Sequence, residues 1–262
     1  MNFRALLASA AVLAAFPALP AAIVTQPVAY EHDGVKLEGF LAYDDAVTTP
    51  RPGVLVLPEW WGLNDYAKGR ARQLAELGYV AFAADLYGAG VTTTDAKRAA
   101  ALAQPFYGDA KKWAARGRAG LDQLLATGKV APGQVAAIGF CFGGSAAQVL
   151  AYSGAPLAGI VSFHGSPIAA WEGASNRAKV LMLHGAADLF IKPEEIAAFE
   201  KSLNAGHFDW QWISYAGAVH AFSNPGADAL GKANGIPIAY NEPAARRSWE
   251  HMKLFFAELF AR

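Results

Sequence analysis

The sequence has a single cysteine, Cys141, so no disulfide bond can form within the chain. Its formal net charge is zero and it has no block of lysine and arginine, which argues against nucleic acid as a partner. It also lacks the histidine spacing H-E-x-x-H of a metal site, and no G-x-G-x-x-G segment opens a helix. We therefore expect no metal, no dinucleotide and no other cofactor. Charged residues make up only 17% of the chain and apolar residues 54%, which predicts a well-packed domain.

Residues 1–22 are predicted to be a secretory signal peptide. A short positive end precedes an apolar run and then small residues broken by proline. The run is too short for a membrane span with stop-transfer flanks. We expect a periplasmic or secreted protein with no membrane span after cleavage near Ala21 or Ala22, and the alternative is an uncleaved amino-terminal anchor. A free thiol in an oxidising compartment favours a cysteine that is either deeply buried or chemically used.

Residues 23–262 are predicted to form a single α/β domain, since no repeat, linker or low-complexity block interrupts them. Strand-like apolar runs alternate with helix-like runs, which is typical of a mainly parallel sheet with helices on both faces. A hairpin around Asp33-Gly34 adds an antiparallel edge at the amino-terminal end. The expected strands are residues 28–30, 35–43, 53–57, 79–84, 135–140, 159–163, 180–183 and 208–215.

Cys141 lies in the segment Gly139-Phe140-Cys141-Phe142-Gly143, between a strand-like run and a helix-like run. This is the G-x-S-x-G pattern of a sharp strand-turn-helix, with cysteine in the place of the nucleophilic serine. Glycines are expected on both sides because side chains there would crowd the backbone of the turn. The amino terminus of the following helix carries partial positive charge, which favours a thiolate. A lone buried cysteine is often only a packing residue, so this interpretation needs support from the rest of the chain.

Two further candidates follow later strands of the predicted sheet. In an open parallel sheet, ligands bind at the carboxyl ends of the strands, so the residues after each strand are candidates for chemistry. Asp188 and His220 follow two such strands and, after Cys141, give the chain order nucleophile, acid, histidine of the α/β-hydrolases. We predict that Cys141, Asp188 and His220 are the catalytic residues.

Three other residues could replace members of this triad. His164 and His184 are alternative bases, although both follow their strands so closely that we expect neither to reach round to the nucleophile. Asp85 is an alternative acid, for which we prefer a structural role at the end of a strand.

Each predicted role has a chemical reason. A thiol with a pKa of ~8.5 is mostly protonated at neutral pH, so His220 is needed to take the proton of Cys141. Asp188 would hold the imidazole in the correct tautomer and stabilise the imidazolium. Backbone N–H groups would form the oxyanion hole, one from Phe142, directly after the nucleophile, and one from Trp60, in the loop after the strand at 53–57.

Five motifs stand out along the chain: Leu57-Pro58-Glu59-Trp60-Trp61-Gly62, Asp85-Leu86-Tyr87, Gly139-Phe140-Cys141-Phe142-Gly143-Gly144, Gly185 to Asp188 and His220-Ala221-Phe222. With these motifs, the sequence over about residues 35–260 resembles the dienelactone hydrolase family of α/β-hydrolases. The resemblance implies an α/β-hydrolase fold and a Cys-Asp-His triad at Cys141, Asp188 and His220. It also implies that Glu59 pairs with the thiol and keeps it neutral until substrate arrives, which protects it from oxidation.

The sequence departs from the family pattern at two positions. Family members that act on carboxylated dienelactones carry arginines where this chain has Ala89 and Asn224. Since arginine is the usual partner of a small carboxylate, dienelactone itself is not expected as substrate. Trp61 and Tyr87, with Ala89 and Asn224, are expected to line a pocket for a neutral or apolar acyl group.

We predict an exported hydrolase of carboxylic esters or lactones, with a small molecule as its partner and a monomer favoured. A peptidase or acyltransferase with the same triad remains open. A catalytically silent binding protein with this fold is another alternative, which the presence of all three triad residues and Glu59 disfavours. A thiol-based redox protein would need a second cysteine, which the chain lacks.

Overall fold

The computed structural model describes residues 22–261, and every structural statement below concerns that part of the chain. Of the predicted signal peptide, residues 1–22, only Ala22 falls within the described residues. The signal peptide therefore stays a prediction, which the intact mass of exported protein would test.

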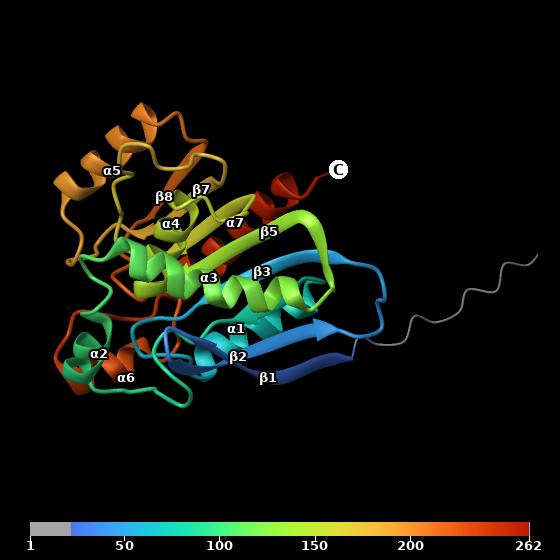
Figure 1. Cartoon of the computed structure of the whole chain (residues 1–262). Helices are drawn as coiled ribbons and strands as arrows, with labels where there is room; N and C mark the ends of the chain where they lie inside the picture. Colours follow the sequence, from blue (N-terminus) through green and yellow to red (C-terminus); the bar gives the residue numbers. More distant parts are fainter. Residues whose placement is uncertain (1–21, 262) are drawn as a thin grey trace, which may run out of the picture.

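Eight strands form one sheet in the order β1-β2-β4-β3-β5-β6-β7-β8 (Figure 1). The six strands from β4 to β8 run parallel, whereas β2 pairs antiparallel with both β1 and β4. The predicted mainly parallel sheet with an antiparallel amino-terminal edge is therefore confirmed. The strands are β1 (Ile23–His32), β2 (Val35–Asp44), β3 (Arg51–Leu57), β4 (Val80–Ala83), β5 (Val130–Phe140), β6 (Gly159–Phe163), β7 (Lys179–Gly185) and β8 (Trp210–Tyr215).

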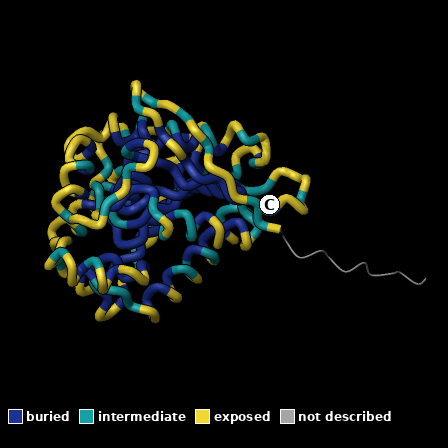
Figure 2. Tube along the Cα trace, turned by 90° about the horizontal axis from the view of Figure 1, so that it is seen from below, coloured by how far each residue is buried: buried dark blue, intermediate teal, exposed yellow. Residues whose placement is uncertain are grey.

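Helices cover both faces of the sheet, and the strands between them are the most deeply buried part of the molecule (Figures 1 and 2). Apolar residues of α1 and α7 pack on one face, and those of α3, α4 and α5 pack on the other. None of the helices within residues 22–261 has the length and apolar character needed to cross a bilayer. The helices are α1 (Asp65–Glu76), α2 (Ala96–Ala103), α3 (Ala110–Ala126), α4 (Phe142–Tyr152), α5 (Pro193–Ala205), α6 (Ala227–Asn234) and α7 (Glu242–Leu259).

The largest differences between the structure and the sequence-based expectations lie at β1, β5 and α6. β1 begins at Ile23 and pairs with β2 along its whole length, so the hairpin is longer than predicted. β5 begins at Val130, where a pairing with Arg51 continues the sheet despite the turn residues Pro132 and Gly133. α6 was not expected from the sequence. It ends at a left-handed Gly235, and the side chain of Asn234 ties it to the start of α2.

Candidate active site

Cys141 lies at the tip of a sharp turn between β5 and α4, as the sequence predicts. Its backbone has φ 52° and ψ −118°, a strained conformation for any residue with a side chain. A Cβ atom at Gly139 would overlap the carbonyl of Gly143, and one at Gly143 would overlap the carbonyl of Leu57. The two glycines therefore let β5, α4 and the end of β3 approach closely enough to place the sulfur at the carboxyl ends of the parallel strands.

Two loops bring Asp188 and His220 together beside Cys141. Asp188 follows β7 and His220 follows β8, and both are buried. Asp188 Oδ2 lies 2.7 Å from His220 Nδ1, while its Oδ1 accepts the backbone N–H of Phe190 at 2.9 Å. Burial alone would lower the pKa of His220, but the charge of the Cys141 sulfur and hydrogen bonds with Asp188 and Cys141 raise it above its usual value. His220 and Asp188 thus form a hydrogen-bonded pair, and His220 lines the same cavity as Cys141.

The backbone N–H groups of Trp60 and Phe142 have no acceptor among the described residues. Phe142 is the first residue of α4, directly after Cys141, so its N–H is one of the unpaired donors at a helix amino terminus. Trp60 lies in the loop after β3, and both residues line the same cavity as Cys141. These two donors have the positions in the chain that an oxyanion hole requires.

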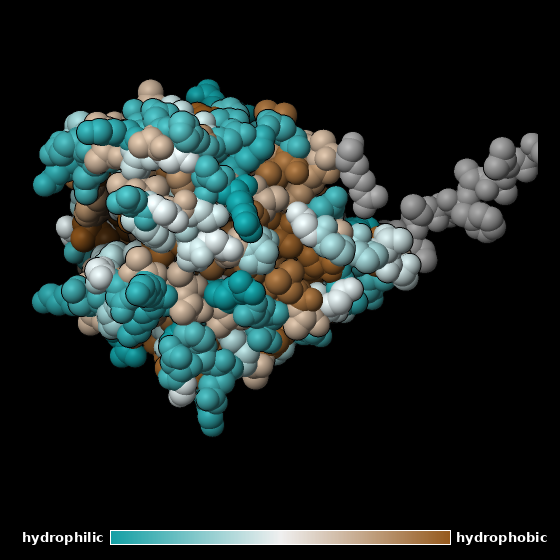
Figure 3. Space-filling model, turned by 45° about the horizontal axis from the view of Figure 1, so that its top comes forward, coloured by the Kyte–Doolittle hydropathy of each residue, from teal (hydrophilic) through white to brown (hydrophobic). Residues whose placement is uncertain are grey.

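The cavity that holds Cys141 has a volume of about 170 Å³ and a mainly apolar lining, which includes the aromatic residues Trp60, Trp61, Tyr107, Phe142 and Phe190. Tyr107 and Phe190 lie half exposed at its entrance. In the space-filling view, hydrophobic side chains gather in a hollow at the left edge (Figure 3), the side on which the parallel strands end in Figure 1. Among the residues that the structure describes, no lysine or arginine lines the cavity, whose ionisable lining residues besides Cys141 and Tyr107 are Glu59 and His220.

Glu59 is a buried carboxyl group that faces the cavity of Cys141. Its Oε2 accepts a hydrogen bond from Asn224 Nδ2 at 2.6 Å, and its Oε1 has no partner among the described residues. Burial raises the pKa of Glu59 from 4.5 to about 7, although Asn224 and the charges of His220 and Arg70 oppose the rise. Glu59 therefore changes its charge near neutral pH, next to the only thiol of the chain.

Replacing Glu59 with glutamine should remove a pH dependence from the stability of the protein. Because the carboxyl pKa is higher in the folded state, its favourable contribution is complete below about pH 4.5 and is lost as the pH rises through about 7. This loss lowers the free energy of unfolding of wild type by roughly 3 kcal/mol, since each unit of pKa corresponds to ~1.4 kcal/mol. Urea unfolding of wild type and Glu59→Gln between pH 4.5 and 8 measures it.

The exposed Glu172, replaced by glutamine, provides the control for this measurement. We expect the free energy of unfolding of wild type minus that of Glu59→Gln to fall with pH, and the corresponding Glu172→Gln difference to stay flat. A flat difference for Glu59→Gln would contradict the raised pKa.

His164 supports the turn at Cys141 from behind. Its Nδ1 accepts the backbone N–H of Cys141 at 3.1 Å, and its Nε2 lies 2.7 Å from Ser223 Oγ. Burial and the positive charges of His220 and Arg70 hold the pKa of His164 well below its usual range, so the ring is neutral. The ring of His164, whose backbone φ is 42°, thus reaches the backbone N–H of Cys141 and not the sulfur, so the expectation that His164 is not the base stays a prediction.

The other two alternatives to the triad have different surroundings. His184 packs against Trp212, with 5.0 Å between ring centres, and its Nδ1 has no partner among the described residues. The carboxylate of Asp85 accepts the backbone N–H groups of Glu38, Tyr87 and Gly88, so it shapes the turn after β4.

Three of the four expected pocket residues do not line the cavity. Trp61 lines it, whereas Tyr87, Ala89 and Asn224 do not. The hydrogen bonds of Asp85 curl the turn so that Tyr87 packs behind Phe142, and Ala89 is exposed with its N–H bonded to Lys36. Asn224 points at Glu59 instead of at a substrate.

The functional network also includes residues that the sequence analysis did not identify. Tyr66 Oη lies 2.8 Å from Ser223 Oγ, and Arg70 Nη2 donates to the carbonyl of Ser223 at 2.8 Å. Ser223 is thereby the link between His164 and α1. Its place three residues after His220 is the only local signal that could have drawn attention to it.

Comparisons with known proteins agree with this geometry. Residues 37–260 match the model of the dienelactone hydrolase family. A dienelactone hydrolase-like promiscuous phosphotriesterase from metagenomic libraries is 41% identical, with a TM-score of 0.86, and the match covers 92% of this chain and all of that one. This chain is also 41% identical over 68 residues to protein usf of Aquifex pyrophilus, a shorter match that covers 24% of this chain and 27% of that protein.

More distant structures share only the fold. The acylaminoacyl peptidase of Pyrococcus horikoshii is 11% identical with a TM-score of 0.66, and the match covers 90% of this chain and 42% of the peptidase. The strand-turn-helix at Cys141, the α/β-hydrolase sheet and the family match over residues 37–260 lead to one conclusion: this chain belongs to the dienelactone hydrolase family.

Proposed function

We propose that this protein hydrolyses neutral carboxylic esters or lactones, with Cys141 as the nucleophile. The observation that carries the proposal is that Cys141 shares a cavity with His220, whose Nδ1 lies 2.7 Å from the buried Asp188 carboxylate. A strained turn that presents a thiol to a histidine paired with a buried carboxylate is the arrangement of a nucleophile, a base and an orienting acid.

The reaction would proceed in two halves. In the first, His220 holds the thiol proton and the Cys141 sulfur attacks the carbonyl carbon, so that the carbonyl oxygen becomes an oxyanion held by the N–H groups of Trp60 and Phe142. The C–O bond to the alcohol then breaks, and the leaving alkoxide takes the proton from His220, which leaves a thioester on Cys141. In the second half, His220 removes a proton from water, the resulting hydroxide adds to the thioester, and the C–S bond breaks to release the acid.

Glu59 would adjust the charge beside the thiol in this mechanism. The family resemblance implies a direct pairing with the thiol, but in this structure the hydrogen bond of Glu59 is to Asn224, and Glu59 shares a cavity with Cys141. We propose that Glu59 acts through its charge in the shared cavity: neutral when protonated, and repelling a thiolate when ionised.

Alkylation of the single thiol tests the proposed function. A panel of p-nitrophenyl esters and lactones is assayed after partial treatment with iodoacetamide, and the alkylated fraction is read from the intact mass. We expect hydrolysis to fall in proportion to that fraction, since Cys141 is the only thiol. Iodoacetamide should leave the residual activity of Cys141→Ser unchanged. Full activity in fully alkylated wild type would rule out the thiol nucleophile.

The lining of the cavity predicts a preference for uncharged substrates. A carboxylate that enters the cavity would meet Glu59 and no lysine or arginine among the described lining residues, so its burial is unfavourable. Matched esters that differ only in one carboxylate should therefore differ in kcat/KM by about tenfold or more in favour of the neutral one, or ~1.4 kcal/mol.

Ile236, which lines the same cavity and is half-buried, allows the preference to be altered. Ile236→Arg should narrow the ratio of kcat/KM values, whereas Leu254→Arg, on the exposed side of α7, should leave it unchanged. A wild-type preference for the carboxylated ester would contradict this account of specificity.

Phosphotriesters are a second candidate substrate class. The observation that favours them is the full-length relative, 41% identical, which is described as a promiscuous phosphotriesterase. A thiolate can attack the phosphorus as it attacks a carbonyl carbon and expel the alkoxide, and the two N–H donors can stabilise the phosphoryl oxygen as they stabilise a carbonyl oxygen. Release of p-nitrophenol from a dialkyl p-nitrophenyl phosphate, lost in Cys141→Ala, would support this candidate, and no release above background would reject it.

A further inference from the structure

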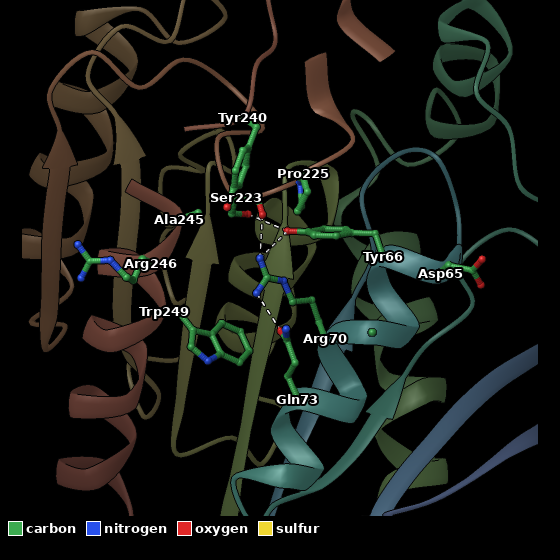
Figure 4. A pocket seen from close by; sticks show the side chains of 11 residues that line it. Asp65, Tyr66, Arg70, Gln73, Ser223, Pro225, Tyr240, Ala245, Arg246 and Trp249 are labelled. Atoms are coloured by element: carbon green, nitrogen blue, oxygen red, sulfur yellow. Dashed lines mark hydrogen bonds between the residues drawn. The ribbon is translucent and has the colours of Figure 1, made fainter. Parts of the chain in front are cut away.

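A second cavity, of about 360 Å³, lies between α1, the start of α7 and the loop that follows His220 (Figure 4). Its lining includes Arg70, Tyr66 and Gly69 of α1, and Trp249 of α7. Ser223 joins this pocket to the surroundings of Cys141, because its hydroxyl reaches His164 while Tyr66 and Arg70 bond to it from the pocket side. This cavity, which we call the Arg70 pocket, shares none of its lining residues with the cavity of Cys141.

The guanidinium of Arg70 lies in the middle of this pocket and has no carboxylate partner among the described residues (Figure 4). Asp65 lines the pocket but points away from it. Arg70 makes three hydrogen bonds, to Gln73 Oε1 at 2.9 Å, to the carbonyl of Ser223 at 2.8 Å and to Tyr66 Oη at 3.4 Å. Since a guanidinium has five N–H donors, the half-buried charge keeps donors for a further acceptor.

Aromatic rings flank this charge. The guanidinium carbon of Arg70 lies 4.8 Å from the ring centre of Trp249 and 5.1 Å from that of Tyr66. Tyr240 also lines the pocket and stands over Ser223 in Figure 4. A cation between aromatic faces suits a ligand with an anionic end and a flat apolar body.

Gly69 gives an independent indication that this space is kept open. It lies inside α1, where glycine costs about 1 kcal/mol relative to alanine. Neither local reason for a glycine applies, because its backbone does not have positive φ and a Cβ atom there would meet nothing within 4 Å. The missing side chain leaves room beside Arg70 instead.

We propose that the Arg70 pocket binds a small aromatic carboxylate, with its carboxylate on Arg70 and its ring against Trp249. The charge, the aromatic walls and the open position at Gly69 each match one part of such a ligand. The proposal is independent of the reaction at Cys141, because it rests on a different cavity.

Binding of benzoate, compared with its neutral analogue benzamide, tests the proposal by isothermal titration calorimetry. Three variants accompany the wild type: Arg70→Gln removes the charge, Gly69→Leu fills the pocket while keeping Arg70, and Arg72→Gln removes an exposed arginine of the same helix outside the pocket. Circular dichroism verifies that each variant is folded.

We expect benzoate to bind wild type and Arg72→Gln with the same Kd. Arg70→Gln and Gly69→Leu should each weaken benzoate binding by about tenfold or more, and benzamide should bind wild type more weakly by a similar factor. The proposal is overturned if wild type does not bind benzoate at millimolar concentration, if benzamide binds equally well, or if Gly69→Leu leaves the affinity unchanged. Because leucine favours a helix more than glycine does, Gly69→Leu remains decisive even if Arg70→Gln fails to fold.

Discussion

Replacing Cys141 with alanine should lower kcat/KM for a neutral p-nitrophenyl ester by about 10³-fold or more without unfolding the protein. The sulfur is the atom that would attack the carbonyl carbon, and alanine has no atom that can replace it. The turn tolerates the change, because an alanine side chain is smaller than the cysteine it replaces. Steady-state kinetics measure the loss, and circular dichroism and thermal unfolding show that the fold remains.

Asp188→Asn and His220→Ala should lower the turnover by a comparable factor. The effects should not add in a double variant, because in the proposed mechanism Asp188 acts only through His220, and His220 acts only in steps that also need the sulfur. Cys141→Ser keeps a hydroxyl at the tip of the turn and should retain more activity than Cys141→Ala. Turnover by Cys141→Ala close to that of wild type, measured on protein free of contaminating esterase, would reject the proposed nucleophile.

Replacing Gly143 with alanine should destabilise the protein by ~3 kcal/mol or more and abolish ester turnover. The added Cβ atom would overlap the carbonyl groups of Leu57 and Pro58, which belong to the backbone and cannot rotate away like a side chain. Relief would require α4 to move away from β3, and with it the backbone N–H of Phe142 and the Cys141 sulfur. Urea unfolding and ester kinetics on the same preparation measure both losses.

Gly117 provides a matched control for this change. It lies inside α3, and a Cβ atom there would make an ordinary contact with Leu150 at 3.5 Å. Gly117→Ala should therefore leave stability unchanged or raise it, because alanine favours a helix more than glycine does. Equal stability of Gly143→Ala and wild type would show that the turn has more freedom than its close contacts indicate.

Most of the fold, and the positions of the three proposed catalytic residues in it, follow from short stretches of sequence. The strand, glycine, nucleophile, glycine and helix around Cys141 are contiguous, so a local pattern contains the whole turn. Asp188 and His220 could be predicted because parallel strands place their carboxyl ends at one edge, whatever the packing of the side chains.

The surroundings of Glu59 could not be predicted in this way. Its partner Asn224 is 165 residues away in the chain, and their contact depends on how two loops meet over the sheet. The same holds for Ala89, which a single turn stabilised by Asp85 places outside the cavity. A family pattern assigns such positions to a pocket, but the hydrogen bonds of this chain decide where the side chains point.

The direction of the strands also determines how the protein can be attached to a solid support or to a fusion partner. Ile23 pairs with Asp44 at the end of the sheet where the parallel strands begin. Leu259, near the end of α7, packs beside Gly159, the first residue of β6. Both ends of the described chain therefore lie opposite the cavity of Cys141 (Figure 1). A tether joined at Ile23 or after Ala261 would leave that cavity facing away from a resin, an electrode or a fused fluorescent domain, so immobilised enzyme should keep free access to dissolved ester.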